Sequence, residues 1–284
     1  AGDLQDWQTP PFEATIVGDY LVGRGVQDDK GPSLAALYAV KSLLDDGIQF
    51  TKRIRFIFGT DEETLWRCMN RYNQIEEQAD LGFAPDSSFP LTYAEKGLLQ
   101  VKLHGPGWDD LPLQAGQALN VVPDKATYAG HRLEELLPVL DQSEVQYSQT
   151  EDSVTVLGVS KHSKDAAEGV NAIVGLAESL SLIQPHPALL FIADAVGEDA
   201  TGEALFGPIS DEPSGDLSFN LATLVIDQEQ SEIGIDIRIP VLADKDALVA
   251  RLQEIAASYQ LEYEEFDYLA PLYVPLDSPL VSSL

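Results

Sequence analysis

The sequence predicts an α/β fold for its first third and a different, α+β texture for the remainder. Up to about residue 96, short apolar runs alternate with a helical pattern, an order typical of strands joined by crossover helices in a mostly parallel sheet. After that point the chain changes to strand-like alternation, as in residues 98–103, interrupted by helical segments. With 284 residues, 44% of them hydrophobic, the chain can bury a substantial core.

The first predicted helix follows a glycine-bearing loop. Pro32 suits the first turn of a helix, where its missing N–H costs no hydrogen bond. Leu34, Leu37 and Leu44 then recur at helical spacing. Gly47 is placed to end the helix, because glycine adopts the left-handed conformation of a helix C-terminus without strain.

Two strands are predicted after this helix. In residues 53–59, Ile54, Phe56 and Phe58 share one face of an extended chain and apolar side chains also occupy the other, as in a strand of a covered sheet. Residues 81–85 form a shorter candidate strand. Ligands of such sheets bind at the carboxyl ends of the strands.

The rest of the chain is predicted from the same periodicities. Residues 221–225 and 233–239 form an expected strand pair. An arrangement of strands followed by a helix is expected twice in this part of the chain. Neither a sequence repeat nor a low-complexity linker marks a boundary between the two. The expected helices are 129–140, 166–183 and 245–259, and the expected strands are 98–103, 145–147, 154–157, 221–225, 233–239 and 261–268.

Charge and cysteine content exclude several classes of function. The chain has 17 Lys and Arg against 47 Asp and Glu, a formal charge of -30, which repels nucleic acid and anionic membranes. Cys68 is the only cysteine, so neither an internal disulfide nor a cysteine zinc site is available. Neither a run of eighteen apolar residues nor a secretion signal is found, and we therefore expect a soluble, cytoplasmic protein.

Three acidic groups stand just after apolar strands or at the entry to a helix: residues 28–29, 61–63 and 86. Each has an ordinary explanation alone, since Asp28 can cap a helix, Glu62 and Glu63 can lie in a solvated loop, and Asp86 can form a turn. Together they are harder to dismiss, because strand ends of one sheet converge and like charges there repel unless a cation joins them. The pattern predicts a divalent metal site.

The three acidic groups lie within longer motifs: GRGVQDDKGP at residues 23–32, GTDEE at 59–63 and GFAPD at 82–86. In the same order, these resemble the G-R-G-x-x-D-D-K-G-P, G-T-D-E-E and G-F-x-P-D motifs of PepV-type dipeptidases, which are carnosinase-like zinc metallopeptidases related to aminoacylases and glutamate carboxypeptidase. The resemblance extends over nearly the whole chain.

The resemblance implies a role for each acidic residue. Asp28 would bridge two Zn²⁺ ions, Glu63 would bind one and Asp86 the other, with Mn²⁺ or Co²⁺ as alternative metals. Glu62 would be the general base. Two metals and a carboxylate that is not a ligand are a suitable set for activating water and carrying its proton to a leaving amine.

The second part of the chain carries three further matches. LNVVPD at 119–124, GVSKHS at 158–163 and IDIRIP at 235–240 are similar to the family's N-x-V-P-D, G-x-x-x-H-[AS] and x-x-R-x-P elements. By resemblance, His162 stabilises the tetrahedral oxyanion, while Asn120 and Arg238 hold the substrate carboxylate. Alone, His162 would be interpreted as a surface histidine and Arg238 as a surface charge on a strand.

The chain departs from the family at both ends. The family supplies a histidine and an aspartate from an H-x-D motif before the equivalent of Ala1, and a further histidine beyond the equivalent of Leu284. Zinc favours histidine nitrogen among its ligands, so affinity falls without these residues. We therefore expect this chain to be an inactive fragment, truncated at both ends and with no metal bound, of an enzyme that holds two zinc ions.

The combined expectation is a metal-dependent dipeptidase that hydrolyses unblocked dipeptides, its small-molecule substrate. Residues 1–96 would form part of a zinc-peptidase-like catalytic domain, 97–270 a lid of two ferredoxin-like halves, and 271–284 the return to the catalytic domain. A doubled lid suggests a monomer. Two alternatives stay open: an aminoacylase or carboxypeptidase-type amidohydrolase, and a non-catalytic scaffold on a decayed peptidase fold.

Overall fold

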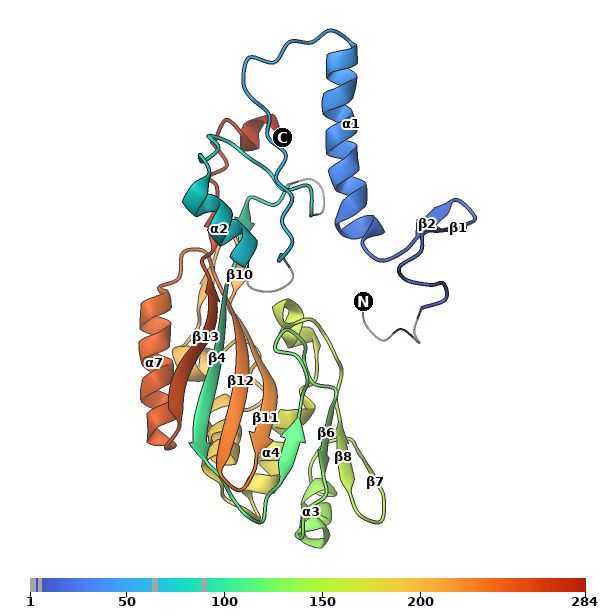
Figure 1. Cartoon of the computed structure of the whole chain (residues 1–284). Helices are drawn as coiled ribbons and strands as arrows, with labels where there is room; N and C mark the ends of the chain where they lie inside the picture. The colour runs from blue at the N-terminus through green and yellow to red at the C-terminus, as the bar shows by residue number, and fades with distance from the viewer. Residues whose placement is uncertain (1–3, 5–6, 63–65, 88–90) are drawn as a thin grey trace. The chain divides into compact units, whose positions relative to one another are not determined.

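The chain folds as two compact units. The computed structural model describes residues 4, 7–62, 66–87 and 91–284. Unit 1 comprises residues 1–92 and 277–284, and unit 2 comprises residues 93–276 (Figure 1). Which unit is catalytic and which is a lid stays a prediction.

In its described residues, unit 1 contains one hairpin, two α-helices and two shorter helical segments. Strands β1 and β2 pair antiparallel. Pro32 lies in the first turn of α1, which ends at Asp45; Asp46 is its C-cap, and Gly47 follows with φ at +82°. The helix predicted from Pro32 and Gly47 is therefore confirmed. The elements of unit 1 are β1 (Thr15–Val17), β2 (Tyr20–Val22), η2 (Val26–Lys30), α1 (Gly31–Asp45), α2 (Arg67–Ile75) and η5 (Val281–Ser283).

The parallel sheet predicted for the first 96 residues is not formed by the described residues. Residues 53–59 and 81–85 are not strands, and every strand pair in the described parts of the chain is antiparallel. A strand requires a neighbour for its backbone N–H and C=O groups, and no described segment pairs with residues 53–59. The rings of Phe56 and Phe58 still stack with centroids 6.4 Å apart, as expected for one face of an extended segment.

Unit 2 is built on a five-stranded antiparallel sheet in the order β13-β4-β12-β11-β5. A three-stranded sheet, β6-β8-β7, and the pairs β3-β14 and β9-β10 complete its strands. Their bounds are β3 (Ala94–Glu95), β4 (Gly97–Pro106), β5 (Leu113–Ala115), β6 (Lys125–Tyr128), β7 (Tyr147–Gln149), β8 (Val154–Leu157), β9 (Ser210–Asp211), β10 (Gly215–Asp216), β11 (Ser218–Ile226), β12 (Gln230–Ile239), β13 (Glu262–Leu269) and β14 (Leu272–Tyr273).

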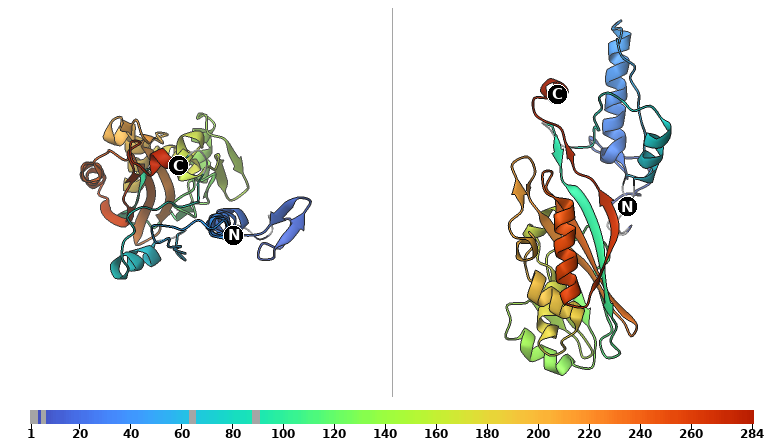
Figure 2. Two further views of the ribbon diagram at one scale, coloured as in Figure 1. Left: turned by 90° about the horizontal axis from the view of Figure 1, so that it is seen from above. Right: turned by 90° about the vertical axis from the view of Figure 1, so that its left-hand side faces the viewer.

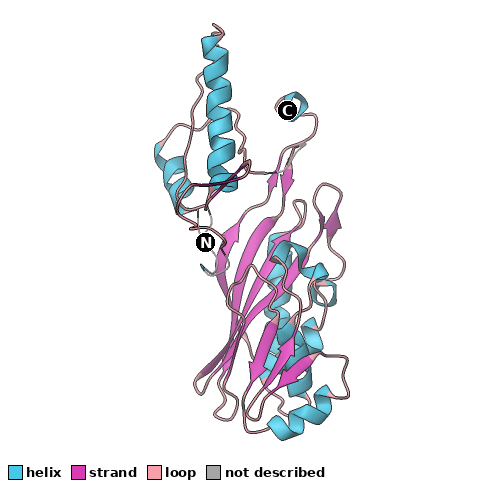
Figure 3. Ribbon diagram, turned by 90° about the vertical axis from the view of Figure 1, so that its right-hand side faces the viewer, coloured by secondary structure: helices cyan, strands magenta, loops and turns pink. Residues whose placement is uncertain are grey.

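Helices pack on one face of the five-stranded sheet (Figures 2 and 3). The orange helix α7 in Figure 2 runs beside β13, where Lys245 Nζ and Glu265 Oε2 lie 2.6 Å apart. The helical segments of unit 2 are α3 (Leu133–Leu140), η3 (Ser163–Glu168), α4 (Ala172–Ser181), α5 (Pro187–Leu190), η4 (Phe191–Val196), α6 (Glu203–Phe206) and α7 (Lys245–Ser258).

Alternation along the strands separates the core from the opposite face. Leu99, Val101 and Leu103 of β4 are fully buried in the core, as the alternation in residues 98–103 predicts. The even-numbered residues of β4 project to the other side. Because Gln100 pairs with Asp236 in register, the even-numbered residues of β12 project to that side as well.

Most elements predicted for unit 2 are present, including the β11–β12 pair, α7 and β13. The single helix predicted at 166–183 is instead two segments, η3 and α4. Between them, Val170 forms an antiparallel bridge with Val159, and Asn171 Oδ1 accepts the N–H of Ile173 at 3.0 Å to start α4. A helix long and apolar enough to cross a membrane is not found in the described segments.

Candidate active site

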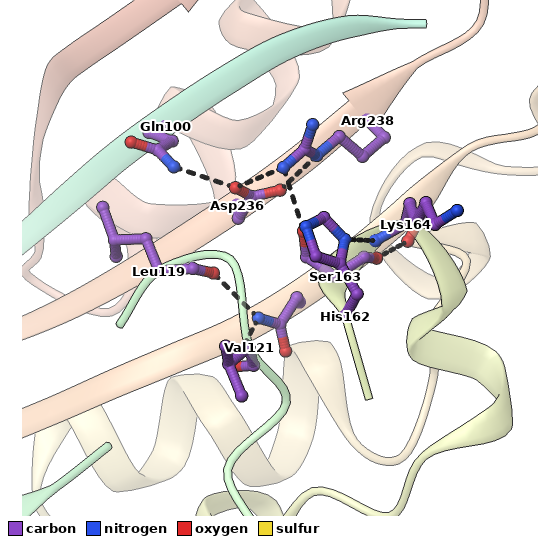
Figure 4. A network of polar contacts seen from close by, with 10 residues as sticks. Gln100, Leu119, Val121, His162, Ser163, Lys164, Asp236 and Arg238 are labelled. Carbon is purple, nitrogen blue, oxygen red and sulfur yellow. Dashed lines mark hydrogen bonds and ion pairs between the residues drawn. The ribbon is translucent and has the colours of Figure 1, made fainter. Parts of the chain in front are cut away.

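His162 is held at the start of η3 with one ring nitrogen engaged. Its backbone bridges Val121, and its Nδ1 accepts the N–H of Lys164 at 3.2 Å (Figure 4). A nitrogen that accepts carries no proton, so the proton of the neutral imidazole lies on Nε2. Partial burial, followed by the positive charge of Arg238, lowers the pKa of His162 and favours this neutral donor form.

Arg238 lies beside His162, fixed by a buried carboxylate. Its Nε donates to Asp236 Oδ1 at 2.7 Å, and its Nη2 donates to Asp236 Oδ2 at 3.3 Å and to Ser163 Oγ at 3.1 Å. The Arg238 side chain is 20% exposed and that of Asp236 is 0% exposed. Gln100 Nε2 donates to Asp236 Oδ2 at 2.9 Å from the adjacent strand β4 (Figure 4).

Asn120 joins the same network through its backbone. Its carbonyl oxygen accepts the N–H of Ser163 at 2.9 Å. On either side of Asn120, the carbonyls of Leu119 and Val121 each accept from Asn220 Nδ2 at 3.0 Å. The loop is thereby fixed, while the side chain of Asn120 is exposed. Unit 2 therefore brings together the three residues predicted for it: Asn120, His162 and Arg238.

Sequence reasoning missed the residues that hold this network. Asp236 stands two positions before Arg238 and so on the same face of β12, and Ser163 directly follows His162. Both lie within matched motifs, which was the available signal. Gln100 had no signal in the sequence, because only the β4–β12 register places it beside Asp236.

In unit 1, Asp28 and Asp29 lie close enough to Asp86 for their charges to act on it. Partial burial, then the negative charges of Asp28 and Asp29, raise the pKa of Asp86. Asp29 Oδ2 accepts from Ser33 Oγ at 3.0 Å, whereas Asp29 Oδ1 is buried without a partner among the described residues. Repelling carboxylates with an unsatisfied buried oxygen have the donor chemistry that a divalent cation requires, so these residues fit part of a metal site.

The two remaining predicted residues are Glu62 and Glu63. Glu62 is exposed at the end of the segment before α2, and Glu63 lies outside the described residues. Asp61, next to Glu62, accepts from Arg67 Nε at 2.7 Å and from the Arg67 backbone N–H at 3.0 Å. Within the described ranges, no three His, Cys, Asp or Glu side chains form a group that could hold a metal ion.

Comparison with known proteins assigns a family to these motifs. Residues 1–281 match the model of peptidase family M20/M25/M40. The chain belongs to this family. Within M20/M25/M40 it is 34% identical over 301 residues to "Putative dipeptidase YtjP" of Bacillus subtilis, covering 98% of this chain and 64% of that protein.

A second curated relative also has a dipeptidase name. "Putative dipeptidase MW1694" of Staphylococcus aureus is 33% identical over 309 residues, covering all of this chain and 66% of that protein. This M20/M25/M40 chain thus spans slightly less than two thirds of the length of these relatives. Among solved structures, human carnosine dipeptidase 1 matches with a TM-score of 0.41 and 14% identity, over 100% of this chain and 62% of that one.

Proposed function

We propose that the full-length protein is a metal-dependent dipeptidase acting on dipeptides whose amino and carboxyl termini are both free. The observation that carries this proposal is the polar network of unit 2, which holds the His162 ring, the Arg238 guanidinium and the backbone of Asn120. The dipeptidase names of relatives about one third identical support the same substrate class.

Each donor suits a different part of a dipeptide. The Nε2–H of neutral His162 can stabilise the negative charge that develops on the carbonyl oxygen during attack. The Arg238 guanidinium matches a carboxylate in shape and charge, and the exposed amide of Asn120 can donate beside it. A substrate with a free carboxyl terminus is therefore preferred.

In this proposal, the carboxylates of unit 1 would bind the metal ions and activate the water that hydrolyses the peptide bond. Asp28 and Asp86, with Glu63, would hold two zinc ions, or manganese or cobalt in their place. When bound, such ions polarise the scissile carbonyl and lower the pKa of water. Glu62 would accept the proton of the attacking water and deliver it to the leaving amine.

A monomer without nucleic-acid or membrane partners is part of the same proposal, as is a cytoplasmic location. The formal charge of -30 supports it, because self-repulsion opposes association between copies. Light scattering coupled to size exclusion tests this point, and a stable dimer would contradict it.

The test of substrate class compares matched dipeptides with the full-length protein loaded with zinc. A free dipeptide, its N-acylated form and its C-terminal amide differ only at their ends. We expect the free dipeptide to be cleaved best and the amide to be cleaved poorly. Cleavage of acylated substrates alone would instead identify an aminoacylase or carboxypeptidase-type enzyme, and no cleavage with any metal would support a non-catalytic scaffold.

A further inference from the structure

The hydrogen bonds of Arg238 leave one part of its guanidinium available. A guanidinium has five N–H donors: one on Nε and two on each Nη. Asp236 takes the Nε donor and one Nη2 donor, and Ser163 Oγ takes the second Nη2 donor. Among the described residues, Nη1 has no partner, so only its two N–H groups remain for a ligand.

Asp236 and Ser163 are themselves held in place. Asp236 Oδ2 also accepts from Gln100 Nε2, and the carboxylate is fully buried. Ser163 is fully buried too, and its N–H and carbonyl engage the Asn120 carbonyl and the Ser218 hydroxyl. The edge of Arg238 that faces Asp236 cannot turn toward a ligand without leaving a buried carboxylate unpaired, which is costly.

We infer that Asp236 is a positioning residue, which restricts Arg238 to binding the substrate carboxylate through Nη1 alone. This inference rests on the proposed function and refines it. A carboxylate seated on one nitrogen leaves its second oxygen for another donor. Asn120 is an exposed residue whose backbone carbonyl accepts from the Ser163 N–H, and its side-chain amide is the donor predicted for that oxygen.

Two opposite expectations exist for the Asp236→Asn variant, which makes it informative. Removing the carboxylate charge leaves Arg238 with an uncompensated positive charge, so simple attraction would strengthen the binding of a carboxylate. Loss of orientation would weaken it, because an Asn can no longer accept from both Nε and Nη2 while also accepting from Gln100. Misplacement of a binding group by about 1 Å can cost about 100-fold in rate.

The experiment measures kcat/KM of the full-length protein for a free dipeptide and for its C-terminal amide. We expect Asp236→Asn to lower kcat/KM at least about 10-fold for the free dipeptide, mainly through KM, and to change it much less for the amide. Glu232→Gln is the matched control, because it removes one carboxylate from the same face of β12 and is paired with Lys102 at 3.1 Å, outside this network. A rise for the free dipeptide, or an equal fall for both substrates, would overturn the inference.

A milder variant guards against misfolding. Gln100→Met removes only the donation to Asp236 Oδ2 and keeps the Arg238 ion pair. The expected result is a smaller loss of kcat/KM, which again is larger for the free dipeptide than for the amide. An unchanged kcat/KM ratio for the two substrates in this variant would count against positioning.

Binding separates this inference from the proposed function. Propionate and propionamide can be titrated while the side-chain N–H resonances of Arg238 are followed by NMR. Propionate should bind more weakly to Asp236→Asn than to the wild type, and propionamide should not respond to the substitution. This result would support positioning even in a protein that cleaves no dipeptide, whereas equal propionate affinity would refute positioning even in an active dipeptidase.

Discussion

The two units differ in how their predicted functional residues are held. In unit 2, the site residues stand on strand β12, at the start of η3 and on a loop, beside a buried core and a buried carboxylate. In unit 1, no described residue is buried as a whole, although the single atom Asp29 Oδ1 is buried, and Asp28 and Asp86 are exposed residues. Leu34 and Leu44 of α1, for example, are 53% and 55% exposed.

This contrast shows that residues singled out by motifs of one family can differ in how firmly the rest of the chain holds them. The donors of unit 2 have their geometry set by their own unit. The carboxylates of unit 1 repel one another and would be ordered by a cation, since opposite charge removes the repulsion that raises the pKa of Asp86. Within the described residues, the site residues of unit 2 are thus held by a buried carboxylate, and those of unit 1 are not.

A pair of leucine substitutions tests the contrast in packing. Leu176 on α4 is 1% exposed, so Leu176→Ala should lower the free energy of unfolding by about 2–5 kcal/mol. Leu34→Ala is the matched change in unit 1 and should cost less than about 0.5 kcal/mol, as expected at an exposed position. Urea unfolding of the full chain measures both, and equal costs would show that the two units are packed alike.

A histidine substitution tests the preorganised donor. His162→Ala should lower kcat by about 100- to 1000-fold with little change in KM, because the lost donor acts on charge present only in the transition state. His131→Ala is the control, since His131 is also exposed and lies outside the network. A loss confined to KM, or none at all, would remove His162 from the proposed oxyanion role.

The pH dependence of stability tests the burial of His186 in unit 2. His186 is 0% exposed; its Nε2 lies 3.0 Å from the Pro106 carbonyl and its Nδ1 accepts from the Ala188 N–H. Burial lowers the pKa of His186, so the unfolded chain binds this proton more readily than the folded one. Stability should therefore fall as pH drops below about 6.5, the unperturbed value for histidine, and level off below the folded pKa.

The variant His186→Gln isolates this contribution. It should have a shallower loss of stability between pH 8 and pH 5 than the wild type, measured by urea unfolding at each pH. His162 contributes in the same direction, because its pKa is lowered too, so part of the slope should remain. An NMR titration in which His186 protonates at or above its unperturbed pKa would contradict the expected direction.

The sequence predicted elements whose signals are local. Pro32 and Gly47 marked the ends of α1, and alternation marked the buried face of β4. It failed for residues 53–59, because a strand exists only if another segment pairs with it. It also failed at Val170, whose bridge to Val159 interrupts a continuous helical pattern and depends on tertiary contact.

The site was found only in part for the same reason. Arg238 and Ser163 are 75 positions apart, and only the folded sheet brings the guanidinium to the hydroxyl. Motif resemblance singled out Arg238 and His162, but no pattern in the sequence shows that Asp236 is fully buried or that Gln100 donates to it. The roles of Asp28, Glu62, Glu63 and Asp86 stay predictions.

The most direct test of the account is the release of amino acids from one free dipeptide by the zinc-loaded, full-length protein and its Glu62→Ala variant. Glu76→Ala, at another exposed glutamate of the same unit, is the control. The account predicts hydrolysis by the wild type and the control, and a loss of about 100- to 10,000-fold in Glu62→Ala, the range for a general base. Equal rates in wild type and Glu62→Ala, or no hydrolysis with zinc, manganese or cobalt, would contradict it.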